Sequence, residues 1–218
     1  MFDAIVYINL NFRTDRRESA LREITKLSHI TKNVHRIDAV FEKWCGHLGC
    51  GKSHVKALEL AIENNWKSVL IVEDDVEFVG DMSNLDKIDE IKWDVMMLGY
   101  GHKRLNKCDY DFLRQVKSTT CAHAYIVRNH YYHILLDNFK NAVLLMTKEL
   151  EVHKEKYQDN PTKLNYCSAI DQTWFSLQDK DTFYTFEPRI AMQRSEMGSD
   201  SNCSMNAHSK IIEAYYNE

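Results

Sequence analysis

Residues 67–77 read KSVLIVEDDVE, a run of apolar residues that leads into three adjacent acids. The segment KSVLIV (67–72) is rich in β-branched and aliphatic residues without polar alternation, which is typical of a strand covered on both faces. AIVYINL (4–10) has the same character. Such strands belong to sheets with helices on both sides, so the two segments together predict a layered α/β fold.

The rest of the chain alternates between helical and extended patterns. Apolar spacing or a suitable cap predicts helices in RRESALREITKLS, HVKALELAIENN with Ser53 as its N-cap, MSNLDKIDEI, NHYYHILLDNF and AIDQTWFSLQ. Further strands are predicted at 33–40, 93–100, 119–127 and within 182–193. The order β-α-β-α-β-α-β indicates one α/β domain with a largely parallel central sheet flanked by helices. We expect this domain to span residues 1–205 and a polar tail to span 206–218.

The composition excludes several classes of protein. The chain has 218 residues, 44% hydrophobic and 28% charged, with a net charge of −4 and a pI of about 6.2. This balance is ordinary for a globular domain and does not favour nucleic-acid binding. No apolar stretch approaches the ~20 residues that a membrane span needs. The opening MFDAIVYINL indicates a first strand rather than a signal peptide, so we expect a cytoplasmic protein.

The cysteines form no C-x-x-C pair, and we expect free thiols in a reducing compartment. Two cysteines and two histidines between 45 and 54 could be arranged as a zinc set, but their spacing matches no common zinc motif. These residues are Cys45, His47, Cys50 and His54.

The segment GHLGCGKS (46–53) satisfies the pattern G-x-x-x-x-G-K-S of phosphate-binding loops. Such a loop should follow directly from a buried strand, so that backbone N–H groups at a helix N-terminus face the phosphates. Here the preceding segment is FEKWC, and the strand before it contains His35, Arg36 and Asp38. A glycine-rich turn into a capped helix is therefore favoured, and a phosphate-loop NTPase stays as an alternative.

The acids Glu73, Asp74 and Asp75 follow the most strongly apolar strand. Adjacent carboxylates repel one another unless a cation offsets them. Ligands of parallel sheets bind beyond the carboxyl ends of the strands, where residues 9–13 also lie. Carboxylate oxygens suit Mg²⁺ or Mn²⁺, which can neutralise a diphosphate leaving group. The pattern predicts a metal–nucleotide site, against the alternative that the acids only solvate a strand end.

Several segments form a further pattern through their order and spacing. They are YINL with residues 14–17, GCGKSH (49–54), VLIVEDDVEF (69–78), Trp93-Asp94 with Leu98-Gly99, AHAY (122–125), Asp171-Gln172, and Pro188 through Gln193 to Ser199-Asp200. Together they resemble glycosyltransferase family 25, which includes bacterial lipooligosaccharide galactosyltransferases and collagen hydroxylysine galactosyltransferases. GCGKSH resembles the family element G-C-x-x-S-H, which requires no lysine. The resemblance therefore makes the match to a phosphate loop a coincidence of letters.

The resemblance implies a single GT-A type (Rossmann-like) domain, a UDP-sugar donor and an inverting transfer to an acceptor hydroxyl. Galactose is the commonest donor sugar in the family, and the acceptor would be a glycan or a hydroxylysine-type group. Two features depart from the family pattern: AID replaces the commoner PVD before the last helix, and the tail after Asp200 lacks the expected apolar residue. Both departures concern the acceptor side.

Roles for individual residues follow from these two lines of inference. The expected metal ligands for Mn²⁺ or Mg²⁺ are Asp75 and Glu73. The expected donor-binding residues are Asn9, Leu10, Arg16, His54, Glu73 and Asp74. Asp171 is the candidate general base, with a plain helix cap as the alternative. Tyr125 and Trp174 could stack on a sugar or belong to the core. A catalytically inactive nucleotide-binding domain remains a second alternative function.

Overall fold

The computed structural model describes residues 1–43, 45–101, 103–158 and 168–197. The strands are β1 (Ala4–Asn9), β2 (Val34–Asp38), β3 (Ser68–Glu73), β4 (Val76–Phe78), β5 (Val95–Met97), β6 (Lys103–Lys107), β7 (Leu113–Thr119), β8 (Ala124–Arg128), β9 (Phe183–Phe186) and β10 (Ala191–Gln193). The α-helices are α1 (Thr14–Thr25), α2 (Gly46–Glu63), α3 (Tyr132–Gln158), α4 (Ile170–Thr173) and α5 (Phe175–Lys180). The 3₁₀ segments are η1 (Ser83–Glu90), η2 (Asn129–Tyr131) and η5 (Ser195–Met197).

Eight strands form one central sheet in the order β2-β1-β3-β8-β5-β9-β7-β6. β1 pairs in parallel with β2 and β3, and β5 pairs in parallel with β9. The other pairs in this sheet are antiparallel, and β4 and β10 form a separate antiparallel ribbon. The expected α/β domain with a central sheet flanked by helices is confirmed; the sheet is mixed, and the acids follow its run of three parallel strands, β2-β1-β3.

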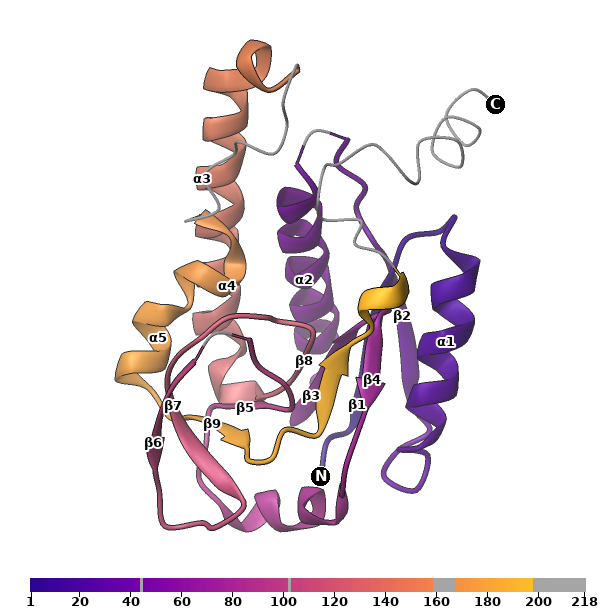
Figure 1. The fold of residues 1–218 in the computed structure, drawn as a ribbon, viewed down its shortest axis with the longest axis vertical. Helices are drawn as coiled ribbons and strands as arrows, with labels where there is room; N and C mark the ends of the chain where they lie inside the picture. Colours follow the sequence, from indigo (N-terminus) through magenta and orange to yellow (C-terminus); the bar gives the residue numbers. More distant parts are fainter. Residues whose placement is uncertain (44, 102, 159–167, 198–218) are drawn as a thin grey trace.

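Alternate residues of the central strands supply two hydrophobic cores. On β3, Val69 and Ile71 pack into a core with α2 and α3, whereas Leu70 and Val72 pack into a core with α1 and η1. All four side chains are fully buried. In Figure 1, α2 and α3 lie side by side, and α1 lies apart from them beyond β1 and β4. The continuous apolar run of β3 is therefore explained by helices on both faces of the sheet.

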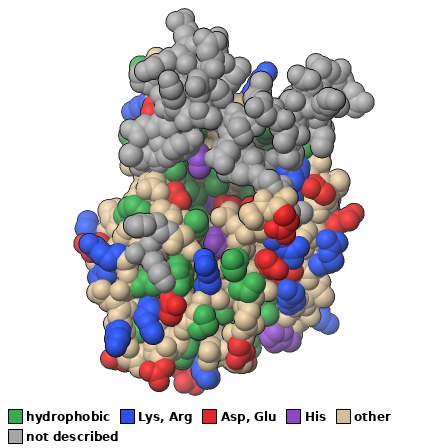
Figure 2. Space-filling view, in the orientation of Figure 1, with side chains coloured by type: hydrophobic (Ala, Val, Ile, Leu, Met, Phe, Trp, Pro, Cys, Tyr) green, Lys and Arg blue, Asp and Glu red, His purple; other side chains and the backbone are tan. Residues whose placement is uncertain are grey.

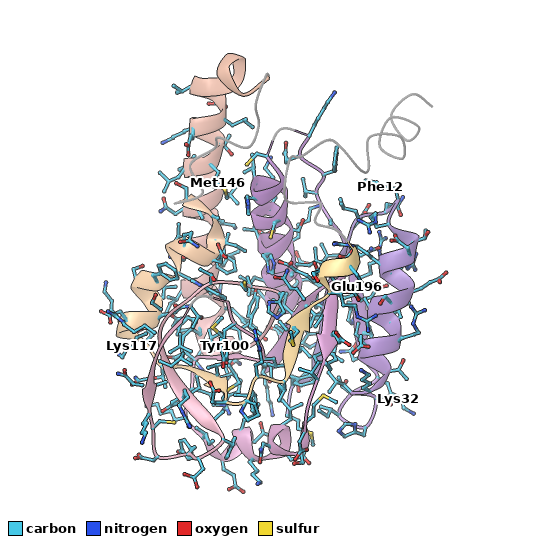
Figure 3. The ribbon with its side chains drawn as sticks, viewed as in Figure 1. Phe12, Lys32, Tyr100, Lys117, Met146 and Glu196 are labelled. Carbon is cyan, nitrogen blue, oxygen red and sulfur yellow. The ribbon has the colours of Figure 1, made fainter. Side chains whose placement is uncertain are left out.

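A glycine allows α2 and α3 to approach closely. A Cβ atom on Gly51 would lie 3.1 Å from Cγ2 of Val143, 3.2 Å from Cγ2 of Ile170 and 3.3 Å from Cε of Met146. Figure 3 labels Met146 on α3, beside α2. Because Gly51 has no side chain, the first turns of α2 can pack closely against α3 and the start of α4.

Helix α2 begins eight residues earlier than the sequence predicts. Ser53 was expected to be its N-cap, but the helix starts at Gly46 and Ser53 lies inside it. The glycines that predicted a turn are accommodated within the helix, because a neighbouring segment packs directly on its backbone at Gly49. AIDQTWFSLQ was expected to form one helix and instead forms the two short helices α4 and α5.

No helix in the described ranges is both long and apolar enough to cross a membrane. The expected boundary between a domain ending at residue 205 and a polar tail at 206–218 lies outside the described residues.

Candidate functional site

A cavity of about 270 Å³ lies at the carboxyl ends of β1 and β3. Its other walls are residues 39–42, the first turns of α2, residues 121–122 and the start of α4. Figure 2 shows a recess in the middle of this face, in which histidine, acidic and hydrophobic side chains lie together. The cavity occupies the edge of the sheet at which ligands of α/β proteins bind.

The middle acid, Asp74, is held by two buried side chains. Its Oδ2 accepts a hydrogen bond of 2.7 Å from Nδ2 of Asn9, and its Oδ1 accepts one of 2.8 Å from the Arg16 guanidinium. All three side chains are buried. A buried ion pair of this kind is costly to break, because removal of either partner leaves a buried charge, at a cost of about 3–5 kcal/mol. Asp74 therefore anchors the ends of β1 and β3 and the start of α1 to one another.

Asp75 has an incompletely satisfied carboxylate. Its Oδ2 lies 3.5 Å from the Arg16 guanidinium, whereas its buried Oδ1 has no hydrogen-bond partner among the residues that the structure describes. Burial, together with the negative charge of Glu73, raises the pKa of Asp75 to about 7, although the charge of Arg16 opposes this rise. A buried carboxylate oxygen without a partner is the position at which a cation would be favourable. Mn²⁺ or Mg²⁺ fits this site because its donors are oxygens.

Glu73 is held from behind by two residues of α2. Its Oε1 lies 3.2 Å from Nε2 of His54 and 3.5 Å from Sγ of Cys50, and its Oε2 accepts a hydrogen bond of 3.3 Å from Gln193. Burial acts to raise the pKa of Glu73, but the hydrogen bond and the charge of His54 outweigh it and lower that pKa. His54 is itself fully buried, and its Nδ1 lies 3.0 Å from the hydroxyl of Tyr125. This chain of contacts fixes the direction of the Glu73 side chain.

The segment that follows β2 is pinned to the second turn of α2. The hydroxyl of Ser53 accepts a hydrogen bond of 2.8 Å from the Val40 backbone N–H and donates one of 2.7 Å to the Gly49 carbonyl. A Cβ atom on residue 49 would collide with the carbonyl oxygen of Val40. Glycine at 49 and serine at 53 therefore allow residues 40–42 to form a wall of the cavity.

GHLGCGKS is helical, which differs from a phosphate-binding loop. Backbone N–H groups of Leu48 and Gly49 already donate to the carbonyl of Cys45. The ammonium group of Lys52 pairs with Glu42. A phosphate loop needs its N–H groups and its lysine directed at the phosphates. The geometry therefore argues against the NTPase alternative.

Asp171 reaches the cavity from a different element, α4. Its Oδ2 accepts a hydrogen bond of 3.0 Å from the backbone N–H of Cys121. Cys121 has a φ of 74°, a left-handed conformation that costs a non-glycine residue roughly 1–3 kcal/mol. Ala169 occupies the N-cap of α4, so Asp171 is not a plain helix cap. The strained residue at 121 directs its N–H at one oxygen of the candidate base.

The structure brings most of the expected site residues to the cavity. Those that line it are Leu10, Arg16, Glu73, Asp74, Asp75 and Asp171. Asn9 and His54 lie behind its wall, where they orient Asp74 and Glu73. Tyr125 and Trp174 are fully buried in the core and cannot stack on a bound sugar.

Three residues that line the cavity were missed as individual site residues. They are His47, Cys121 and Gln193. Burial lowers the pKa of His47, and nearby acids oppose that effect. Gln193 falls in the last segment that resembles family 25, and His47 was considered only as part of a zinc set. The positive φ of Cys121 has no sequence signature, since glycine is the residue normally found in that conformation.

The sequence profile described as "Glycosyltransferase family 25 (LPS biosynthesis protein)" matches residues 45–150. The family 25 resemblance is confirmed. The matched region of this glycosyltransferase contains the GCGKSH segment and all three acids at the end of β3, whereas Arg16 and Asp171 lie outside it. None of the curated proteins matches the chain significantly in sequence.

Solved structures similar to this glycosyltransferase are distant from it in sequence. A197 from STIV is 12% identical, with a TM-score of 0.45 and coverage of 88% of this chain and 94% of that chain. A glycosyltransferase involved in the glycosylation of the major capsid of PBCV-1 is 12% identical, with a TM-score of 0.42 and coverage of 93% and 98%. UDP-glucose pyrophosphorylase complexed with UDP-glucose is 8% identical, with a TM-score of 0.48 and coverage of 100% and 99%. Likenesses at this level do not bear on the activity of this chain.

Proposed function

We propose that this glycosyltransferase transfers a sugar from a UDP-sugar to an acceptor hydroxyl with inversion at the anomeric carbon. Galactose is the first donor sugar to test. The observation that carries the proposal is the cavity, which gathers the acids that end β3 and the carboxylate of Asp171 from α4. The family match supports glycosyl transfer as the reaction class.

The donor side of the proposed site is the wall formed by β1, β3 and residues 39–42. Asp75, with Glu73 as its neighbour, would hold Mn²⁺ or Mg²⁺ through carboxylate oxygens. A bound divalent cation neutralises negative charge on the diphosphate leaving group. The apolar residues of this wall include Ile8, Leu10 and Phe41, which offer a surface for the nucleobase. Arg16 keeps Asp74 and Asp75 in place through its two contacts.

The acceptor side of the proposed site is the wall formed by residue 121 and α4. Asp171 accepts the proton of the acceptor hydroxyl while that oxygen bonds to the anomeric carbon. The bond from the anomeric carbon to the diphosphate oxygen breaks in the same displacement, and UDP carries away the electron pair. Oδ2 of Asp171 accepts the hydrogen bond from the Cys121 N–H, so Oδ1, which accepts only a long hydrogen bond of 3.4 Å from Gln172, is the oxygen that would meet the acceptor. An acceptor of the glycan or hydroxylysine type would present such a hydroxyl.

A donor screen tests the proposal. The purified chain is incubated with UDP-galactose, UDP-glucose, UDP-N-acetylglucosamine and GDP-mannose, each with Mn²⁺ or with EDTA, and release of the nucleoside diphosphate is measured. We expect release from a UDP-sugar that depends on metal and falls in Asp171→Asn. A chain that binds UDP with Mn²⁺ but releases none would be an inactive nucleotide-binding domain. ATP hydrolysis that is lost in Lys52→Ala would contradict the proposal and restore the NTPase alternative.

A further inference from the structure

Three side chains of different chemistry converge on one point at the floor of the cavity. The thiol of Cys50, the imidazole of His54 and the carboxylate of Glu73 have ligand atoms that all lie within 4.8 Å of one another. Cys50 is a free cysteine, and both it and Glu73 line the cavity. Glu73 also belongs to the proposed oxygen site at Asp75, and the oxygen that meets Cys50 and His54 is its Oε1.

Two of the three distances among these atoms match those around a tetrahedral ion. Zinc binds sulfur at about 2.3 Å and imidazole nitrogen or carboxylate oxygen at about 2.0–2.2 Å. At tetrahedral angles, these lengths place sulfur about 3.5 Å from oxygen, and nitrogen about 3.3 Å from oxygen. Here Sγ of Cys50 lies 3.5 Å from Oε1 of Glu73, and Nε2 of His54 lies 3.2 Å from the same oxygen. The third pair, the sulfur of Cys50 and the ring nitrogen of His54, lies within 4.8 Å, against about 3.5 Å at tetrahedral angles.

The imidazole is also oriented in the way that metal sites require. A ligating histidine usually has its second ring nitrogen fixed by a hydrogen bond, which sets the tautomer and the ring direction. Nδ1 of His54 lies 3.0 Å from the hydroxyl of Tyr125, and the two rings stack with centroids 5.7 Å apart. Because His54 is fully buried, its ring has few other orientations available.

We propose that Cys50, His54 and Glu73 bind a thiophilic divalent cation of the zinc class, with a fourth coordination position open to the cavity. Three protein ligands with one open position are typical of zinc sites that take up a further ligand from solution. Sulfur and imidazole ligands distinguish this site from the oxygen site at Asp75, which suits Mn²⁺ or Mg²⁺. On binding, the sulfur–metal bond replaces the S–H bond of Cys50, and the proton passes to solvent. The proposal does not depend on the transfer reaction.

Without a metal, the same distances would describe a thiol and an imidazole that both donate hydrogen bonds to Glu73. Co²⁺ distinguishes the two cases, because a tetrahedral cobalt–thiolate site gives a charge-transfer band in the near ultraviolet and intense visible d–d bands. We expect both features when Co²⁺ is added to the chain, with a stoichiometry of one. We expect Zn²⁺ to displace the cobalt and remove them.

Variants then assign the ligands. Cys50→Ser should abolish the charge-transfer band and weaken Zn²⁺ binding by more than about 100-fold, because even loss of an outer hydrogen-bond partner costs about 10- to 100-fold. Tyr125→Phe should weaken binding by about 10-fold and keep the band. Cys108→Ser is the matched control, because Cys108 is a free thiol away from the three ligands, and its Sγ donates hydrogen bonds to the carbonyls of Tyr110 and Leu113. It should bind as the wild type does.

A protection experiment provides a readout that does not require a folded variant. The wild-type chain is alkylated with iodoacetamide with and without Zn²⁺, and modification at each cysteine is measured by mass spectrometry. Zn²⁺ should slow alkylation of Cys50 at least tenfold and leave Cys121, on the same cavity, unaffected. Absence of the cobalt–thiolate band, a band that persists in Cys50→Ser, or equal alkylation of Cys50 in both conditions would overturn the proposal.

Discussion

Replacing Asp75 by asparagine should stabilise the metal-free protein while weakening its metal-dependent binding of UDP. Oδ1 of Asp75 is buried without a hydrogen-bond partner among the described residues, and Glu73 lies two positions away at the same strand end. Asparagine keeps the shape of the side chain and removes the charge. It retains an oxygen that can face the Arg16 guanidinium, which stays paired with Asp74.

The size of the stabilising effect follows from the pKa of Asp75. Burial, assisted by Glu73, raises this pKa from 3.8 to about 7. As the pH rises between these values, the unfolded chain loses the proton first, so the free energy of unfolding of the wild type falls. At about 1.36 kcal/mol per pH unit, the complete loss is about 4 kcal/mol and is reached above pH 7. The asparagine variant has no proton to lose, and we expect it to be more stable at pH 8 by about 1–3 kcal/mol, since its amide is also desolvated.

Thermal unfolding at pH 5 and pH 8, with and without Mn²⁺, measures this prediction. For a chain of this length each kcal/mol shifts the Tm by about 2–4 °C. Without metal, the variant should melt above the wild type at pH 8, and the gap should narrow at pH 5. Mn²⁺ should raise the Tm of the wild type only, and Kd for UDP with Mn²⁺ should rise at least tenfold in the variant, about 1.4 kcal/mol. Asp137→Asn, an exposed position on α3, is the control and should change neither quantity. A variant no more stable than the wild type at pH 8, or stabilised equally by Mn²⁺, would refute the reasoning.

Four further substitutions concern α2 and α4. Lys52→Ala should keep most UDP-sugar turnover, because Lys52 pairs with Glu42; loss of UDP binding in this variant would contradict its assignment. Asp171→Asn should lower kcat for transfer by a factor of about 10² to 10⁴ and leave Kd for UDP unchanged, and near-normal transfer would exclude it as the base. Gly49→Ala should lower the free energy of unfolding by at least about 3 kcal/mol in urea titrations, because its Cβ meets a backbone carbonyl. Gly51→Ala should cost about 1 kcal/mol, because its Cβ meets only side-chain ends and alanine favours a helix; equal losses in the two would contradict this reading.

The apolar run of β3 was predictable because one physical cause determines it. Residues 69–72 face helices on both sides, and a doubly covered strand must be apolar throughout. The start of α2 was not predictable by the same means. Three glycines between 46 and 51 locally favour a turn. The helix forms there because residues 40–42 pack directly on Gly49 and side chains of α3 pack on Gly51, contacts that a larger residue would prevent. Residues 101–118 were assigned no element, although the polar β6–β7 hairpin lies there at the edge of the sheet.

The part of the site formed by adjacent acids could be predicted, because a cluster of like charges can be recognised in the sequence. The acids 73–75 stand together after a strand, and the structure places all three on the cavity. The role of each acid could not be predicted from the sequence, however, because it depends on the tertiary contacts: Asp74 pairs with Arg16, and Glu73 contacts His54. The partner of Asp171 was hidden for a different reason. It is a backbone N–H, presented by a left-handed cysteine that no residue pattern indicates.

The geometry of α2 explains why GCGKSH has its spacing. Gly49 and Ser53 are four residues apart, so they share one helical stripe, and that stripe faces residues 40–42. Cys50 and His54 form the adjacent stripe by the same spacing, and that stripe faces Glu73 on β3. Two interleaved pairs at i and i+4 thus attach one helix to two walls of the cavity. Lys52 falls on neither stripe, and its ammonium group is already paired with Glu42, so the lysine that completes the phosphate-loop pattern is not directed at a phosphate.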